Sequence, residues 1–146
     1  MSPTNLRPEL AHRLRQRLDA FGEGFRHNLA LLGPPGSGKT FQLQELIRAR
    51  PTNALVIYCP LYHESCRSFL RRFLCAVLQA GLAGETPDAD PPAQSHPLET
   101  LLERADVQLP NTAAAIRAIE GLLTKRLYSE AFNRALDTIP ILGAER

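Results

Sequence analysis

The chain has 146 residues, of which 44% are hydrophobic and 22% are charged, and its net charge at pH 7 is +2. This length suits one modest domain, and this composition is typical of globular proteins rather than of disordered or membrane chains. The small net charge gives no argument for a nucleic-acid partner, so any DNA or protein partner is left open. No apolar run reaches the length of a membrane span, and residues 1–10 lack the hydrophobic core of a signal peptide. We therefore expect a cytoplasmic protein with no membrane partner.

Residues 6–21 predict an amphipathic helix. Leucine and phenylalanine recur at helical spacing along one face, at Leu6, Leu10, Leu14, Leu18 and Phe21. Arginines lie off this stripe and are expected to face solvent rather than a nucleic acid. The pair of glycines in residues 22–24 then predicts the end of the helix.

Residues 33–40 match the phosphate-binding pattern G-x-x-x-x-G-K-[ST] without a mismatch, as Gly33-Pro34-Pro35-Gly36-Ser37-Gly38-Lys39-Thr40. Glycines allow successive backbone N–H groups to turn toward one anion, which side chains at every position would prevent. Lys39 supplies a positive charge for the β- and γ-phosphates, and Thr40 offers a hydroxyl to Mg²⁺ at the start of a helix. The motif and the next residue, Phe41, therefore predict a site for ATP and Mg²⁺.

The flanks of the motif favour this interpretation. Residues 28–32 form a short apolar run that predicts a parallel strand buried on both faces. Apolar residues then recur at helical spacing from Phe41 until Pro51. Residues 54–59 predict a second strand, closed by Pro60, so that strand, helix and strand form a right-handed crossover unit.

The rest of the chain is expected to be mainly helical. Residues 66–80 predict a helix whose apolar face holds Phe69, Leu70, Phe73, Leu74, Val77 and Leu78. Residues 81–97 are rich in proline, glycine and acidic residues and predict a surface loop. A short helix over 98–107 and a long helix over 111–137, capped at Asn111 or Thr112 and closed by Pro140, complete the pattern.

The three cysteines, Cys59, Cys66 and Cys75, cannot all pair, and we expect reduced thiols. Cys59, His63 and Cys66 are potential metal ligands, but their spacing matches no closed zinc site. Arg67, Arg71 and Arg72 are expected to be solvated.

The elements up to about residue 82 resemble the opening part of an AAA+ ATPase of the P-loop superfamily, close to the replication-initiator-like and STAND types. The resemblance rests on residues 33–40, on the second strand ending at Pro60 and on the helix from Cys66. It also implies that the Arg7 region lies near adenine. It implies an α/β fold with parallel β-strands and flanking helices, and initiator-like or STAND relatives imply DNA transactions or signalling.

The resemblance also implies elements that this sequence does not contain. Such ATPases carry a strand that ends in Asp-Glu, where the aspartate holds magnesium, and an arginine finger further on. Asp19, Asp106 and Asp137 lie in helical patterns, and Asp88 and Asp90 lie in the proline-rich loop. Residues 139–146 resemble the approach to the missing strand, so we expect a helix-rich, partial P-loop fold that stops before it.

The expected division is 6–27 for the first helix and lead-in, 28–60 for the nucleotide-binding unit, 61–80 for a helix, 81–97 for a loop and 98–146 for a helical segment. The leading hypothesis is ATP binding, with hydrolysis uncertain and no catalytic residue identified. One alternative is a kinase of the nucleoside monophosphate type, with Arg67, Arg71 and Arg72 near the acceptor. Another is a nucleotide-gated interaction module completed by self-association, a partner or further sequence.

Overall fold

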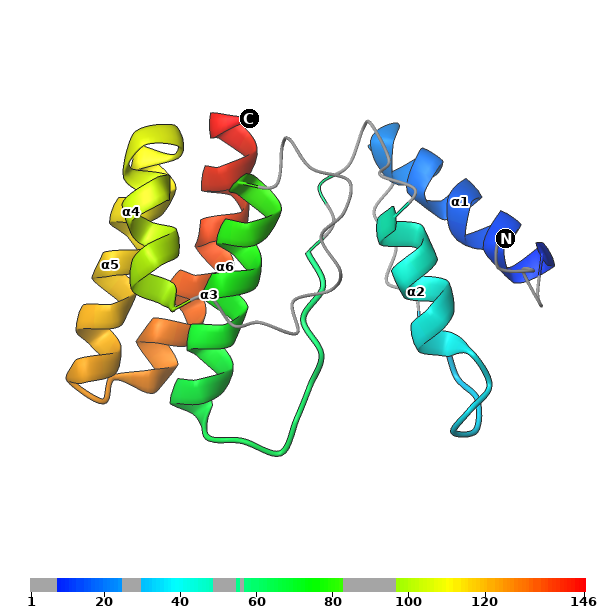
Figure 1. Cartoon of the computed structure of the whole chain (residues 1–146), viewed down its shortest axis with the longest axis horizontal. Coiled ribbons are helices and arrows are strands. Elements are labelled where there is room, and N and C mark those ends of the chain that lie inside the picture. The colour runs from blue at the N-terminus through cyan, green and yellow to red at the C-terminus, as the bar shows by residue number, and fades with distance from the viewer. Residues whose placement is uncertain (1–7, 25–29, 49–54, 56, 83–96) are drawn as a thin grey trace. The chain divides into compact units, whose positions relative to one another are not determined.

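The computed structural model describes residues 8–24, 30–48, 55, 57–82 and 97–146, and within them it contains six helices (Figure 1). The helices are α1 (Pro8–Gly22), α2 (Lys39–Arg48), α3 (Cys66–Leu82), α4 (Leu98–Gln108), α5 (Pro110–Thr124) and α6 (Tyr128–Glu145). The chain divides into two compact units, Met1–Val56 and Ile57–Arg146. The first unit holds α1 and α2, and the second holds α3 to α6.

The first unit confirms both helices that the sequence predicts there. Pro8 begins α1, where its missing N–H costs nothing, and the chain leaves the helix at residues 23–24, with Gly24 at φ 94°. α1 packs on α2, and Leu14 of α1 and Gln42 of α2 are both buried. The rest of the predicted stripe is less covered, because Phe21 is 52% exposed. The predicted start of the helix at Leu6 lies outside the described residues.

The predicted α/β fold with parallel strands is wrong, because the described part of the chain contains helices and no strand. Of the predicted first strand, Ala30, Leu31 and Leu32 are irregular, and Leu32 is 92% exposed rather than buried. Residues 28 and 29 of that strand lie outside the described residues. A strand requires a neighbour for its backbone hydrogen bonds, and an apolar run alone does not supply one.

The second predicted strand, residues 54–59, is also irregular wherever the structure describes it. Ile57 packs against the helical core of the second unit, so its apolar side chain is covered by helices instead of by a sheet. Arg72 donates a hydrogen bond to the carbonyl oxygen of Pro60, which fastens this segment to α3. Within this segment Ile57 therefore contacts a helical core, Leu55 is 39% exposed, and residues 54 and 56 lie outside the described residues.

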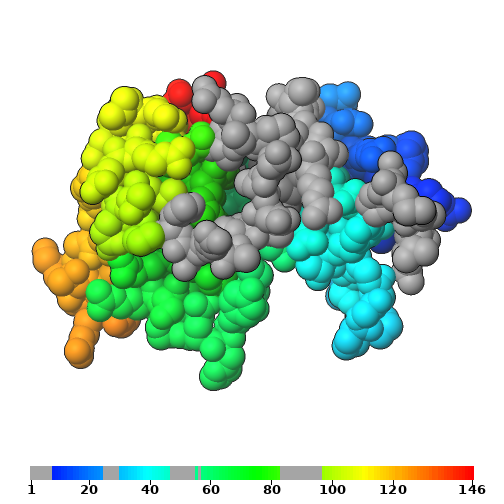
Figure 2. Space-filling model, viewed as in Figure 1, coloured from blue at the N-terminus to red at the C-terminus, as the bar shows by residue number. Residues whose placement is uncertain are grey.

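The second unit is a four-helix bundle. α3 contacts each of the other three helices, and α5 contacts α4 and α6 (Figure 1). α5 runs opposite to α4 and α6 in Figure 1, as the very short connections at Leu109 and at residues 125–127 require. Figure 2 shows the atoms of α4, in yellow, lying directly against those of α3, in green.

The core of the bundle is aliphatic. Its largest fully buried side chains include Leu70, Leu74, Leu78, Leu101, Ile116, Ile119, Leu123 and Leu142. The predicted apolar face of residues 66–80 is confirmed by this burial, with Phe69 and Phe73 packed at its edge. Gly81 lets α3 approach its neighbours closely, because a Cβ atom there would lie 2.6 Å from Leu142 Cδ1 and 2.7 Å from Leu109 Cδ1.

Ion pairs join the helices at the rim of this core. Arg71 Nη2 lies 2.6 Å from Glu99 Oε1, and Arg71 Nε lies 3.3 Å from Glu120 Oε1, so one arginine of α3 connects α4 and α5. Arg117 of α5 forms a two-point pair with Asp106 of α4. These partly exposed pairs orient the helices more than they stabilise them.

The predicted single helix over residues 111–137 is wrong at three points. It begins at Pro110 instead of after an Asn111 or Thr112 cap, and it breaks at Lys125 and Arg126, where Arg126 adopts a left-handed φ of 59°. Pro140 does not end α6, which continues to Glu145, so the predicted approach to a magnesium-binding strand at 139–146 is helical over Ile139–Glu145. A proline inside a helix loses one hydrogen bond and crowds the carbonyl group four residues earlier, at a cost of about 3 kcal/mol. α6 continues through Pro140 with Thr138 and Leu142 on either side of it buried in the bundle.

The start of α5 is capped by the end of α6. The Glu145 carboxylate accepts hydrogen bonds from the backbone N–H of Asn111 at 2.7 Å and of Thr112 at 2.9 Å, and from the Thr112 hydroxyl. Arg146 donates to the carbonyl oxygen of Ala80 at 3.2 Å, which ties the same end of α6 to α3. Desolvation raises the pKa of Glu145, but the hydrogen bonds from Thr112 and Asn111 together outweigh it and leave this pKa below its ordinary value.

We expect Glu145→Gln to lower the free energy of unfolding by about 1 kcal/mol at pH 7, because the charged cap of α5 is lost. The folded-state pKa of Glu145 is depressed, so its contribution is present above the unfolded value of about 4.3 and is lost as the pH falls through the folded value. The difference between parent and variant should therefore shrink in acid. Urea unfolding at several pH values measures it. Asp137→Asn, on an exposed position of the same helix, is the control, and equal effects of the two substitutions would contradict the capping role.

We expect Arg126→Gly to stabilise the bundle by about 1 kcal/mol, because a left-handed φ is strained for a residue with a Cβ atom and free for glycine. Lys125→Gly, next to it, should instead destabilise, since Lys125 has an ordinary φ of −80°. Urea unfolding followed by circular dichroism compares the two. A loss of stability in both variants would show that Arg126 is not strained.

Candidate phosphate-binding loop

Residues 33–38 form a tight loop that leads directly into α2. Gly36 and Gly38 have left-handed φ values of 76° and 81°, on either side of Ser37. The Ser37 N–H donates to the carbonyl oxygen of Pro34 at 3.3 Å, and the Gln42 N–H donates to that of Gly38 at 3.0 Å, which starts the helix. Left-handed residues that alternate with right-handed ones are typical of backbone nests that bind anions, and the positions of Gly36 and Gly38 on either side of Ser37 match that pattern.

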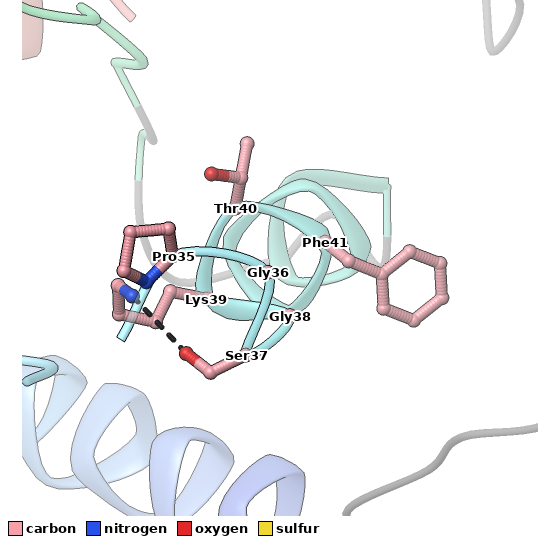
Figure 3. A pocket seen from close by; sticks show the side chains of 7 residues that line it. All are labelled: Pro35, Gly36, Ser37, Gly38, Lys39, Thr40 and Phe41. Carbon is pink, nitrogen blue, oxygen red and sulfur yellow. Dashed lines mark hydrogen bonds between the residues drawn. The ribbon is translucent and has the colours of Figure 1, made fainter. Parts of the chain in front are cut away.

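Lys39, the first residue of α2, folds back over this loop (Figure 3). Its Nζ donates to the carbonyl oxygens of Gly33 at 2.7 Å and Pro34 at 2.8 Å, and to Ser37 Oγ at 3.1 Å. An ammonium group has three N–H donors, so the loop itself accepts all of them. The positive charge is therefore held against the turn by its own backbone.

Two positions in the loop depend on glycine for different reasons. At Gly33, a Cβ atom would lie 2.9 Å from Ser37 Oγ and 3.9 Å from Lys39 Nζ, so a side chain would disturb the contacts of the lysine. At Gly36 nothing lies within 4 Å of such an atom, and the requirement comes from the left-handed φ alone. The glycines of the phosphate-binding pattern are thus required by a close contact at Gly33 and by a left-handed φ at Gly36.

The loop and the start of α2 surround an open hollow of about 320 Å³, lined by Pro35, Gly36, Ser37, Gly38, Lys39, Thr40 and Phe41. The structure thus gathers seven of the nine predicted site residues around one space, while Gly33 and Pro34 supply the carbonyl groups that hold Lys39. Thr40 is exposed, so its hydroxyl can reach a ligand. The Phe41 ring points away from Lys39 in Figure 3.

The electrostatics at this end of α2 favour an anion. The helix N-terminus carries partial positive charge, Lys39 adds a full charge, and the first turn contains no acidic residue. Two sources of positive potential thus coincide with the loop glycines. An anionic group in the hollow would balance both.

The arginines considered for a kinase acceptor site have other partners. Arg71 is paired with Glu99 and Glu120 within the bundle, and Arg72 is paired with Glu64. The Arg72 guanidinium also lies 4.8 Å from the centre of the Tyr62 ring. Arg67 is exposed on α3. The two Arg71 pairs could not be predicted from the sequence, because Glu99 and Glu120 are distant from Arg71 along the chain.

The cysteines belong to the second unit and are free thiols. Cys59 Sγ lies 3.6 Å from an Arg72 nitrogen, and burial raises the pKa of the Cys75 thiol. Among the residues that the structure describes, no three His, Cys, Asp or Glu side chains come together as metal ligands. Of the aspartates considered for magnesium, Asp106 is paired with Arg117, and residues 88 and 90 lie outside the described ranges. Arg7, which the resemblance places near adenine, also lies outside them.

Comparison with protein-family models, with curated proteins and with solved structures gave no match for this chain. None of the described helices combines the length and the hydropathy that crossing a membrane requires. The resemblance to AAA+ ATPases therefore remains a prediction from the motif.

We expect Gly36→Ala and Gly38→Ala each to destabilise the first unit by about 1 kcal/mol, because alanine is strained at these φ values. Gly121→Ala is the matched control: Gly121 lies inside α5 with nothing within 4 Å of the added carbon, so alanine should stabilise that helix. The hydrogen-exchange rates of the α2 amides measure this loss of stability next to the loop, and they should rise in both loop variants. Unchanged exchange in both loop variants would contradict the left-handed geometry.

Proposed function

We propose that residues 33–40 bind the triphosphate of ATP together with Mg²⁺. The observation that carries the proposal is the Lys39 ammonium group, which is held against the left-handed glycine turn at the start of α2. The choice of ATP over other nucleoside triphosphates rests on the AAA+ resemblance of the motif.

The chemistry of the loop suits a phosphate chain. Backbone N–H groups of a nest hydrogen-bond to phosphate oxygens, and the helix N-terminus contributes partial charge. Lys39 would exchange one or more of its bonds to Gly33, Pro34 and Ser37 for the β- and γ-phosphates. Because its partners are carbonyl and hydroxyl oxygens, which are neutral, a phosphate oxygen competes well for the same N–H groups.

The Thr40 hydroxyl fits the role of a magnesium ligand. Mg²⁺ prefers oxygen ligands and binds with one or two protein groups, phosphate oxygens and water. Thr40 is exposed beside Lys39 and presents such an oxygen. Bound Mg²⁺ would neutralise phosphate charge at the open side of the hollow.

Binding is proposed here, and hydrolysis is not part of the proposal. Neither alternative from the sequence has the same support. The kinase alternative needs several free arginines for the acceptor, whereas Arg71 and Arg72 are paired with Glu99, Glu120 and Glu64, and Arg67 alone of the three is left exposed. The interaction-module alternative also includes nucleotide binding, and it differs only in what that binding controls, which is association with another chain.

We expect Lys39→Ala to weaken MgATP binding by about 10- to 100-fold, because a charge-assisted contact is lost. The chain contains only one other lysine, Lys125, and Lys125→Ala should bind like the parent. Titration with a fluorescent ATP analogue measures both. Equal affinity of Lys39→Ala and the parent would refute the proposal.

We expect Thr40→Val to weaken ATP binding when Mg²⁺ is present and to change it little in EDTA, because the variant lacks only the hydroxyl proposed to bind the metal. The same titration measures it in both buffers.

A further inference from the structure

Ser37 shares the Lys39 ammonium group with two backbone carbonyl oxygens. Its Oγ atom accepts a hydrogen bond from Lys39 Nζ at 3.1 Å, which is the dashed line in Figure 3. The bonds from the same nitrogen to the carbonyl oxygens of Gly33 and Pro34 are shorter, at 2.7 Å and 2.8 Å. By its length, the bond to Ser37 is therefore the weakest of the three.

The bond to Ser37 is also the one that borders the hollow. Ser37 and Lys39 both line this space, whereas Gly33 and Pro34 are not among its lining residues. Both partners of the bond are thus accessible to a ligand in the hollow. The two carbonyl groups hold Lys39 from outside that lining.

Ser37 can release Lys39 without a change in the backbone. Its hydroxyl is attached through one rotatable side-chain bond, and rotation about this bond moves Oγ while the loop keeps its shape. The carbonyl oxygen of Pro34 lacks this freedom, because it also accepts the Ser37 N–H at 3.3 Å as part of the turn. Of the three bonds, the one to Ser37 can therefore be exchanged with the least rearrangement.

Gly33 leaves the space that this hydroxyl occupies. A Cβ atom at Gly33 would lie 2.9 Å from Ser37 Oγ, but 3.9 Å from Lys39 Nζ. The hydroxyl would be displaced first, because it is the nearest atom and stands at the end of a side chain. The lack of a side chain at residue 33 therefore lets Ser37 reach the lysine.

We infer that Ser37 is a positioning residue that controls the proposed phosphate site through Lys39. Without a ligand, its hydroxyl occupies one N–H of the lysine and keeps the ammonium group beside the hollow. A phosphate oxygen then takes over this N–H, while the bonds to Gly33 and Pro34 persist. Ser37 thus competes with the ligand and lowers its affinity. The inference rests on the proposed function of residues 33–40, and it adds which bond of Lys39 is exchanged.

The first test measures the reactivity of Lys39 in the full chain without nucleotide. Ser37→Ala should raise the acylation rate of Lys39, relative to Lys125 in the same molecule, by about threefold or more, because one N–H loses its partner. Ser37→Thr keeps the hydroxyl and should react like the parent. Ser68→Ala removes a serine hydroxyl that is bonded to Ser65 in the second unit, and it should leave the rate unchanged.

Gly33→Ala breaks the same bond from the other side. The added carbon displaces Ser37 Oγ, so the acylation rate of Lys39 should rise as it does in Ser37→Ala. Two substitutions at different residues then report on one hydrogen bond. Hydrogen-exchange rates of the α2 amides close to those of the parent confirm that the loop is folded in each variant.

The second test measures the affinity for MgATP by titration with the fluorescent analogue. Ser37→Ala should bind about threefold to tenfold more tightly than the parent, because the ligand no longer has to displace the hydroxyl. Ser37→Thr should bind like the parent. A substitution that only damaged the loop would weaken binding, so the direction of the change separates the two roles.

Two results would overturn the inference. One is an acylation rate of Lys39 that is the same in Ser37→Ala and in the parent. The other is an affinity of Ser37→Ala for MgATP that is equal to or weaker than that of the parent. Failure of the proposed function gives a different result, namely no saturable MgATP binding by the parent, whatever the acylation rates measured without nucleotide.

Discussion

The proposed phosphate site depends on the contact between the Lys39 ammonium group and the loop that precedes it. Three short hydrogen bonds hold the charge against Gly33, Pro34 and Ser37, at the point where α2 begins. The left-handed turn at Gly36 and Gly38 lies between these carbonyl groups and the lysine in the chain. An anion-binding function follows from these local features together, since neutral oxygens are weaker partners for an ammonium group than phosphate oxygens are.

Features that depend on residues close in the sequence could be predicted, whereas features that depend on contacts between distant segments could not. The loop, the start of α2 and the apolar face of α3 follow from glycine positions and helical spacing within a few residues. The two strands did not form in the described residues, because a strand needs a partner that an apolar run does not specify, and Ile57 found a helical core instead. The charged cap of α5 by Glu145 could not be predicted, because it joins residues more than 30 positions apart.

The proposed phosphate site lies in one of the two units. The loop belongs to Met1–Val56, whereas the ion pairs and the aliphatic core belong to Ile57–Arg146. In the bundle, the Glu145 carboxylate caps the start of α5. Arg71, Arg72 and Arg117 each form an ion pair with a carboxylate of the same unit. On α6 the bundle leaves Phe132, Leu136 and Ile139 between 41% and 49% exposed, beside a buried side that belongs to the core.

The most direct test is the acylation rate of the two lysines, measured site by site by mass spectrometry. Lys125 is exposed and serves as the internal standard within the same molecule. Because the loop engages every N–H of Lys39, we expect Lys39 to react more slowly than Lys125 without ligand, and more slowly still with MgATP, while the rate at Lys125 stays constant. Equal rates at both lysines, unchanged by MgATP, would contradict both the contact and the function proposed for it.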